Sequence, residues 1–249
     1  MDFKDPIKKG NTAQIYLHNE KIVKVFNDRL PDTEAEYEAH KQRYARSCGL
    51  PVPYIYDVTK INGKQVIIME YIQGKTFGEI IFDDIAKAEE YMDLSVNIQI
   101  KIHSVKADNF NLMTEKLSRQ IHSARLINEK QKETLLNKMY SIKFDNHLCH
   151  GDYHVYNVIY NNNNAVIIDW VDASAGDIRA DVCRSYILYS QFSMELAELY
   201  LRLYCEKSKI LKDEILMWDS IIAGAGLSEN MSEEKANYLI NIVNSRCPL

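Results

Sequence analysis

An aspartate and an asparagine with the spacing D-x-x-x-x-N occur in the segment HGDYHVYN at residues 150–157. In this spacing a carboxylate, Asp152, can face a substrate hydroxyl while an amide oxygen, from Asn157, turns towards a metal ion. Asp169 follows after the apolar run at residues 166–168. Phosphoryl transfer relies on groups that position phosphates, hold metal ions and orient the incoming hydroxyl. These residues therefore favour phosphoryl transfer as the chemistry.

The segment between Asn157 and Asp169 is predicted to form a hairpin. Two short apolar runs flank asparagines at residues 161–164, and asparagine tolerates the left-handed conformation that a tight turn needs. A hairpin brings its two ends together, so Asn157 and Asp169 are expected to meet at one Mg²⁺ site. Both side chains offer the hard oxygen ligands that magnesium requires.

A β-rich region precedes this hairpin in the sequence. Runs of β-branched and aromatic residues predict strands at residues 13–17, 21–26, 54–59 and 65–71. Turn residues at 18–20 and 61–63 join them into hairpins. A single helix is predicted between residues 31 and 49. Capping residues stand ahead of its acidic first turn, and Gly49 ends it.

Lys24 stands inside the apolar strand predicted at residues 21–26. Burying an ammonium group without compensation is costly, so Lys24 is expected to have an anionic partner. The alternative is an exposed lysine on an edge strand.

From about Gly74 the apolar residues follow helical periodicity, first at 85–105 and 112–140 and again beyond Asp177. The sequence therefore predicts an α+β fold of two lobes. Residues 1–72 are expected to form a small β-rich N-terminal lobe, and residues 73–249 a larger, mainly helical lobe; the family resemblance given below implies that the first binds nucleotide and the second serves catalysis and acceptor binding. The cleft between the lobes is the expected site.

The motif HGDYHVYN followed by VIIDW at residues 166–170 resembles the aminoglycoside phosphotransferase family, which shares the protein-kinase-like fold. The resemblance implies that Asp152 orients or deprotonates the acceptor hydroxyl, and that Asn157 and Asp169 bind Mg²⁺. It covers nearly the whole chain. It is weakest after about Ser190, where this family builds its acceptor pocket.

The same resemblance implies a site for ATP or GTP in the N-terminal lobe. Lys24 would bind the α and β phosphates and pair with a helix glutamate, for which Glu38 is preferred and Glu34 or Glu36 are alternatives.

Two further parts of the nucleotide site are implied by position. Gly10 would belong to the phosphate-covering loop at residues 10–16, although one glycine before a strand is also consistent with a simple turn. The backbone at Glu70 and Ile72, where the lobes join, would hydrogen-bond the adenine edge.

Several features distinguish the chain from protein kinases. Gly151 replaces the arginine of the H-R-D motif, Trp170 replaces the phenylalanine of D-F-G, and the stretch from Asp169 to Asp177 leaves no room for a long activation segment. These differences favour a small-molecule acceptor. Asp181 resembles the buried aspartate with which the family braces its catalytic loop. His103 is interpreted as a helix-packing residue.

The identity of the acceptor stays open, with aminoglycosides, choline, homoserine, sugars and macrolides all compatible with the motifs. An aminoglycoside acceptor would imply antibiotic resistance. Acidic residues in the later helices could line a pocket for such a polycation, or could form solvated helix faces: Asp172, Glu195, Glu198, Glu206, Asp213, Glu214 and Asp219. A catalytically silent nucleotide-binding module is the alternative from another class.

Composition excludes several other classes of protein. The net charge of -5 argues against a general nucleic-acid binder, which usually carries a basic excess. No apolar run approaches the roughly 20 residues needed to cross a bilayer, and no apolar signal core opens the chain, so a cytoplasmic location without membrane partners is expected. The five cysteines form no C-x-x-C pair and predict neither a disulfide framework nor a zinc site.

Overall fold

The computed structural model describes residues 5–10, 12–107 and 110–247. The chain divides into two compact units. Unit 1 comprises Met1–Asp83 together with Val155–Val171, and unit 2 comprises Asp84–His154 together with Asp172–Leu249. Asn157 and Asp169 therefore belong to the same unit as Lys24, whereas Asp152 belongs to the other.

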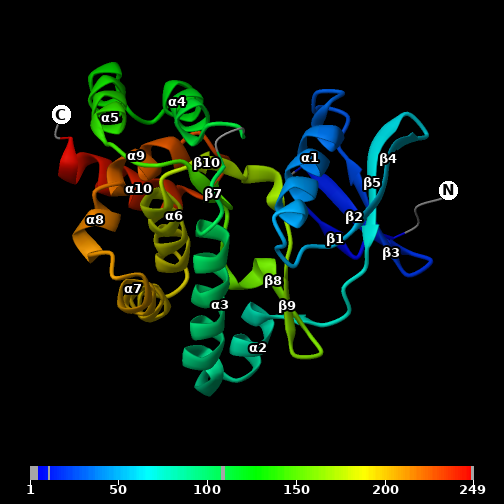
Figure 1. The fold of residues 1–249 in the computed structure, drawn as a ribbon. Coiled ribbons are helices and arrows are strands. Elements are labelled where there is room, and N and C mark those ends of the chain that lie inside the picture. Colours follow the sequence, from blue (N-terminus) through cyan, green and yellow to red (C-terminus); the bar gives the residue numbers. More distant parts are fainter. Residues whose placement is uncertain (1–4, 11, 108–109, 248–249) are drawn as a thin grey trace. The chain divides into compact units, whose positions relative to one another are not determined.

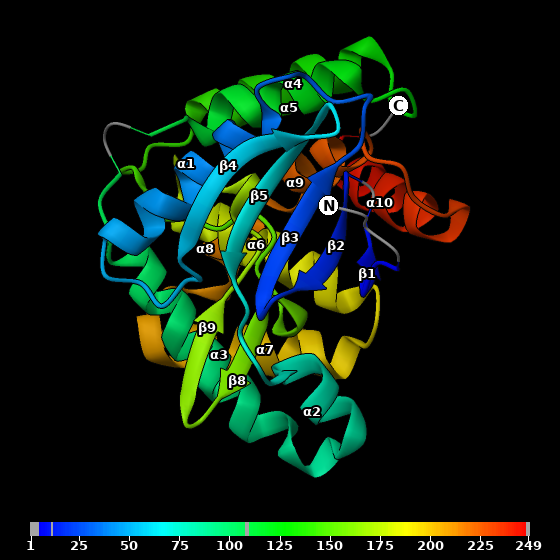
Figure 2. The same cartoon turned by 90° about the vertical axis from the view of Figure 1, so that its right-hand side faces the viewer.

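Unit 1 contains an antiparallel sheet with the strand order β1-β2-β3-β5-β4 (Figure 2). Its strands are β1 (Lys8–Lys9), β2 (Ala13–His18), β3 (Lys21–Phe26), β4 (Ile55–Ile61) and β5 (Lys64–Glu70). Asn19 and Glu20 turn between β2 and β3, and Asn62 and Gly63 between β4 and β5, all with positive φ. This is the conformation that two-residue hairpin turns require. The predicted strands and both hairpins are confirmed.

Helix α1 (Glu34–Ser47) packs against β4 and β5. Ala35 and Ala39 on its inner face join Phe26 and Ile67 of the sheet in one apolar cluster. The predicted side-chain cap at the start of this helix is wrong, because Thr33 makes no capping hydrogen bond.

The second part of unit 1 is the predicted hairpin of β8 (Val158–Asn161) and β9 (Asn164–Ile167). Asn162 and Asn163 turn between the strands with φ of 45° and 67°, so the asparagine run acts as predicted. A short strand that the sequence did not reveal, β6 (Lys75–Thr76), pairs with β8 and leads into α2 (Phe77–Asp83).

Unit 2 is mainly helical, as predicted (Figure 1). Its helices are η1 (Ile85–Lys87), α3 (Ala88–His103), α4 (Met113–Ser123), α5 (Glu129–Ser141), α6 (Ile178–Ser190), α7 (Met194–Ser208), α8 (Lys212–Leu216), α9 (Asp219–Gly226) and α10 (Glu233–Arg246). Helix α9 is buried along residues 220–226 and packs with α4, α5, α6 and α10, as a central helix should. In the described part of the chain, no helix combines the length and apolar character needed to cross a membrane.

A small two-stranded sheet in unit 2 positions the segment that carries Asp152. Strand β7 (His147–Cys149) pairs antiparallel with β10 (Ser174–Gly176). The residues that follow β7, 150–154, are called the catalytic loop below, after the predicted role of Asp152.

Candidate active site

In unit 1, Lys24 is almost completely buried within β3, between its neighbours β2 and β5. Its Nζ donates to Glu38 Oε1 at 2.5 Å and to Asp169 Oδ1 at 3.5 Å. Burial alone would lower the pKa of Lys24, but the charges of Glu38 and Asp169 outweigh it and raise the pKa. The expected anionic partner is thus Glu38 of α1 and not Glu34 or Glu36, and Lys24 remains a cation.

Asn157 and Asp169 stand at the open end of the β8-β9 hairpin, beyond its pair Val158 and Ile167. The backbone N–H of Ile168 donates to the carbonyl of Asn157 at 3.0 Å, which places Asp169 one residue from this contact. Asp169 has φ of 65°, a left-handed conformation that costs a non-glycine residue about 1–2 kcal/mol. Such strain persists where the surrounding structure enforces it, and it is concentrated at functional sites.

The donor atoms of this cluster fit a magnesium ion. An amide oxygen from Asn157 and a carboxylate from Asp169 are hard ligands, and the Asp169 side chain is 43% exposed and can therefore meet a ligand. Within the described residues, Glu38 Oε2 is buried without a hydrogen-bond partner. A buried unsatisfied carboxylate oxygen is uncommon in folded proteins and is consistent with a further partner at this site.

Helix α1 also contacts the segment that follows Asp169, through Lys41. Sequence reasoning missed this contact. Lys41 is buried, lies over the ring of Tyr37 and donates from Nζ to the carbonyl of Val171 at 2.5 Å. One helix face therefore contacts Lys24 through Glu38 and the chain just after Asp169 through Lys41. The sequence held no signal for this contact, because its two partners are far apart in the chain.

The nucleotide-binding roles expected of Gly10, Glu70 and Ile72 stay predictions. The N–H of Gly10 donates to the carbonyl of Ala13 at 2.9 Å, while Asn11 of the predicted phosphate loop lies outside the described residues. Glu70 ends β5 and uses both its N–H and its carboxylate to bind the backbone of Tyr54. Ile72 follows β5 outside regular secondary structure and is half-buried.

In unit 2, the carboxylate of Asp152 lies between the side chains of His154 and Arg184. Its Oδ2 is 3.5 Å from His154 Nε2, and its Oδ1 is 4.0 Å from Arg184 Nη2. Burial would raise the pKa of Asp152, but the hydrogen bond and charge of His154, with the charges of Arg184 and His150, lower it well below its usual range. Asp152 is therefore ionised at neutral pH and can accept a hydrogen bond from a hydroxyl.

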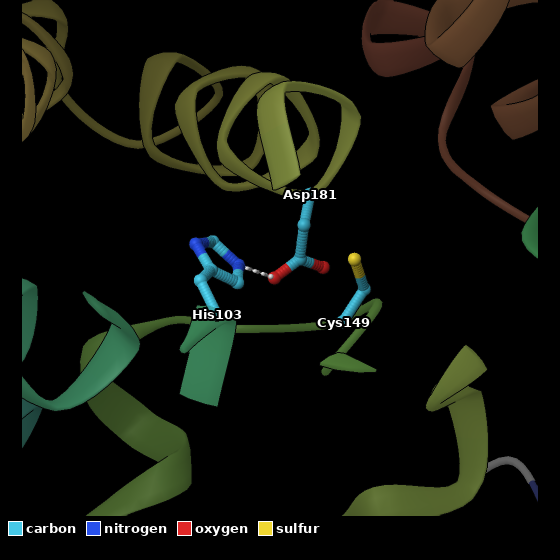
Figure 3. A group of neighbouring side chains, drawn as sticks. All are labelled: His103, Cys149 and Asp181. Atoms are coloured by element: carbon cyan, nitrogen blue, oxygen red, sulfur yellow. Dashed lines mark hydrogen bonds and ion pairs between the residues drawn. The ribbon is translucent and has the colours of Figure 1, made fainter. Parts of the chain in front are cut away.

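Asp181 of α6 binds the backbone of the catalytic loop. Its Oδ1 accepts the N–H of Gly151 at 2.7 Å, and its Oδ2 accepts the N–H of His150 at 3.3 Å. Figure 3 shows Asp181 pointing between His103 and Cys149, with His103 Nε2 at 2.9 Å from Oδ2. Burial would raise the pKa of Asp181, but His103 and the loop N–H groups lower it, so Asp181 is an anion.

The group of His103, Cys149 and Asp181 has the residue types of a metal site, yet its ligand atoms are engaged otherwise. His103 uses its second ring nitrogen, Nδ1, to contact the hydroxyl of Tyr204 at 2.7 Å. Burial raises the pKa of the Cys149 thiol well above its usual value, which disfavours the thiolate that a metal would need. The group supports the loop, and His103 is the buried helix-packing histidine that the sequence predicted, with both ring nitrogens hydrogen-bonded.

The profile of the phosphotransferase enzyme family (APH) matches residues 5–216, which is most of the chain. The chain belongs to this family. A search of curated proteins found no significant match.

Solved structures show the fold of this family member. It resembles the aminoglycoside phosphotransferase APH(4)-Ia, solved as a thermostable mutant with AMP-PNP and hygromycin B, at 14% identity and a TM-score of 0.71 over 98% of this chain and 94% of that one. It also resembles APH(2")-IIa, solved with streptomycin and ATP, at 17% identity and a TM-score of 0.65 over 97% and 90%. It also resembles a protein from Haemophilus somnus assigned as a fructosamine-3-kinase, at 12% identity and a TM-score of 0.72 over 98% of this chain and 90% of that one.

Because these identities are low, the likeness establishes the fold alone. The predicted α+β fold of the protein-kinase-like class, with a β-sheet lobe at the N-terminus and a helical C-terminal part, is confirmed. The predicted family is confirmed by the profile match.

Gly151 of this phosphotransferase should not tolerate a side chain. Its φ is 81°, and a Cβ there would collide with the carbonyl of Asp172. Gly63, in the β4-β5 turn, has the same φ of 81° but open space around it, so it is a matched control. Gly63→Ala is expected to lower the free energy of unfolding by about 1–2 kcal/mol through backbone strain alone. Gly151→Ala should lose at least about 1 kcal/mol more from the collision.

Denaturant unfolding of both variants measures this difference. Gly151→Ala should also lower kcat, because the loop that carries Asp152 must shift, while Gly63→Ala should leave kcat unchanged. Equal losses of stability in the two variants would contradict the packing of Gly151 on Asp172.

Proposed function

We propose that this family member transfers the γ-phosphate of ATP or GTP to a hydroxyl of a small molecule in a magnesium-dependent reaction. The observation that carries the proposal is the cluster of Lys24, Glu38 and Asp169, with Asn157 at the same hairpin end. It combines a buried cation for phosphate oxygens with hard oxygen ligands for a metal ion. A purely structural ion pair would not need Asp169 to adopt a left-handed conformation.

Each side chain has a role in this mechanism. Lys24, held by Glu38, binds the phosphates of the nucleotide, and Asn157 with Asp169 holds Mg²⁺. The bound ion would neutralise charge on the phosphate oxygens. Asp152 accepts a hydrogen bond from the acceptor hydroxyl and aims its oxygen at the γ-phosphorus.

The transfer step is balanced within these groups. As the bond from the acceptor oxygen to the γ-phosphorus forms, the bond to the oxygen that bridges the β and γ phosphates breaks, and the nucleoside diphosphate leaves. The hydroxyl proton passes to Asp152. Because the pKa of Asp152 is low, the carboxylate is a weak base. Its proposed role is therefore to orient the hydroxyl and to take the proton late, as a loose transition state allows.

The small size of the acceptor is supported by the segment after Asp169. The residues between Asp169 and Asp177 form η3 (Trp170–Asp172) and β10, and β10 is paired with β7. No long activation segment is therefore present between these two aspartates to bind a protein substrate.

A coupled assay of ADP or GDP release tests the proposal. Wild-type protein should release the diphosphate in the presence of Mg²⁺ and a suitable member of an acceptor panel of aminoglycosides, amino alcohols, sugars and hydroxy acids. EDTA should abolish this release. Nucleotide binding in a thermal-shift measurement without any acceptor-dependent release would instead support the silent nucleotide-binding module.

A further inference from the structure

A cavity in unit 2 lies next to the catalytic loop. It consists of two adjoining hollows that share Arg184, Ile222 and Glu229, and Gly151 lines the first of them. The second has a volume of about 260 Å³. This is below the roughly 300–1,000 Å³ of pockets that enclose drug-sized ligands, so a small ligand is indicated.

Arg184 of α6 connects this cavity to Asp152. Its side chain is only 17% exposed, and its Nη2 lies 2.9 Å from Glu229 Oε1 and 4.0 Å from Asp152 Oδ1. A molecule that fills the cavity and contacts Arg184 can therefore place a hydroxyl beside Asp152. The cavity has the position expected of an acceptor site.

The carboxylates near the cavity are already neutralised. Glu229 is paired with Arg184, and Asp172 is paired with Lys116 at 2.6 Å. Asp181, which lines the first hollow, is committed to His103 and to the backbone of the catalytic loop. An aminoglycoside would have to displace these cations before its ammonium groups could bind.

Lys235 adds a positive charge to the second hollow. It lines the second hollow, half-buried, with its Nζ 5.4 Å from the ring centre of Phe192. In the part of the chain that the structure describes, no carboxylate lies within ion-pair distance of Lys235. Glu233 and Glu234, in the same turn of α10, are exposed and line neither hollow.

We infer that the acceptor is a small hydroxylated anion, whose carboxylate or phosphate group binds Lys235 and Arg184 while its hydroxyl reaches Asp152. This inference rests on the proposed function and specifies its acceptor. Arg184 is suited to the role because a guanidinium binds a planar carboxylate or a phosphate through two hydrogen bonds, and Glu229 is hydrogen-bonded through Nη2 of this side chain. Lys235 supplies the charge that selects an anion over a neutral polyol.

Binding of matched probes tests this inference separately from turnover. Glycerate, glycerol 3-phosphate and glycerol share one carbon skeleton and differ in the anionic group, and streptomycin serves as the polycation. Calorimetry on the full chain should show at least one of the two anions binding about tenfold or more tightly than glycerol, a difference of about 1.4 kcal/mol. Lys235→Met should remove most of that preference, while Lys130→Met, at an exposed site of α5, should keep it.

The outcomes separate the two hypotheses. If both anions bind no better than glycerol, if streptomycin binds more tightly than they do, or if Lys235→Met keeps the preference, the acceptor inference is overturned, although phosphoryl transfer can still stand. If the anionic probes bind as expected but no acceptor is ever phosphorylated, the acceptor site is supported and the proposed function fails. The choice between glycerate and glycerol 3-phosphate identifies the anionic group.

Discussion

Asp152→Asn is expected to lower kcat by about 10²- to 10⁴-fold while the affinity for Mg-ATP stays unchanged. Asparagine keeps the size of the side chain but offers the acceptor hydroxyl a neutral amide oxygen. The proton of the attacking hydroxyl then has no carboxylate to receive it. Steady-state kinetics with a responsive acceptor and calorimetry with Mg-ATP measure the two quantities.

The electrostatic setting of Asp152 explains why a large effect is expected from one charge. His154, Arg184 and His150 together hold the pKa of the Asp152 carboxyl well below its usual range. The folded protein thus maintains an ionised carboxylate at this position, and asparagine removes its charge. Because the folded pKa is the lower one, this ionised form also stabilises the folded state above the usual aspartate pKa. That contribution is lost as the pH falls through the folded pKa.

The control for this variant is Asp145→Asn, at an exposed aspartate just before β7. It makes the same chemical change in the same unit and should leave kcat unaltered. Wild-type turnover by Asp152→Asn would refute the role of Asp152. An equal loss of Mg-ATP affinity and kcat would assign Asp152 to the nucleotide site instead.

Local signals carried the parts of the fold that the sequence predicted correctly. The asparagine run at 161–164 specified the turn of the β8-β9 hairpin, because left-handed residues are a property of the turn itself. The apolar setting of Lys24 was sufficient to predict a buried anionic partner. Helical periodicity at 112–140 was also correct, but it did not show that two helices, α4 and α5, fill this stretch. Asn128 with Gln131 forms the capping box that begins α5, and this signal was readable.

Contacts between distant parts of the chain were out of reach. Strand β6 has only the residues Lys75 and Thr76, and its pairing with β8 fixes it more than its composition does. Nothing in the sequence around His103 indicates that its ring contacts Asp181. Likewise, nothing around Arg184 indicates that its side chain lies between Asp152 and Glu229. The cavity proposed as the acceptor site is made of such contacts, which is why the phosphotransferase motif was readable from the sequence and the acceptor class was not.

Asp169→Asn is expected to weaken Mg-ATP binding by at least about 100-fold. Mutation of a residue that only hydrogen-bonds to a metal ligand already weakens metal binding by up to about 100-fold, and Asp169 is proposed to bind the metal directly. Asparagine is the informative replacement, because it tolerates the φ of 65° at this position and removes only the charge. The variant replaces the proposed carboxylate ligand of Mg²⁺ by a neutral amide oxygen, and it removes one of the two anions that keep Lys24 charged. Glu38 remains, so the fold of unit 1 should persist.

Calorimetric titration with ATP in Mg²⁺ and in EDTA distinguishes the metal role from a general loss of charge. Wild-type protein should bind ATP much more tightly with Mg²⁺, and Asp169→Asn should bind it about equally weakly in both. Asp57→Asn, at an exposed aspartate of β4, should behave as wild type. If Asp169→Asn kept the full magnesium dependence, the charge of the Asp169 carboxylate would not be needed to bind the metal ion, and the metal-ligand role of this carboxylate would be refuted. Its left-handed backbone would then serve only the ion pair with Lys24, and the metal site would have to be sought among other oxygen donors.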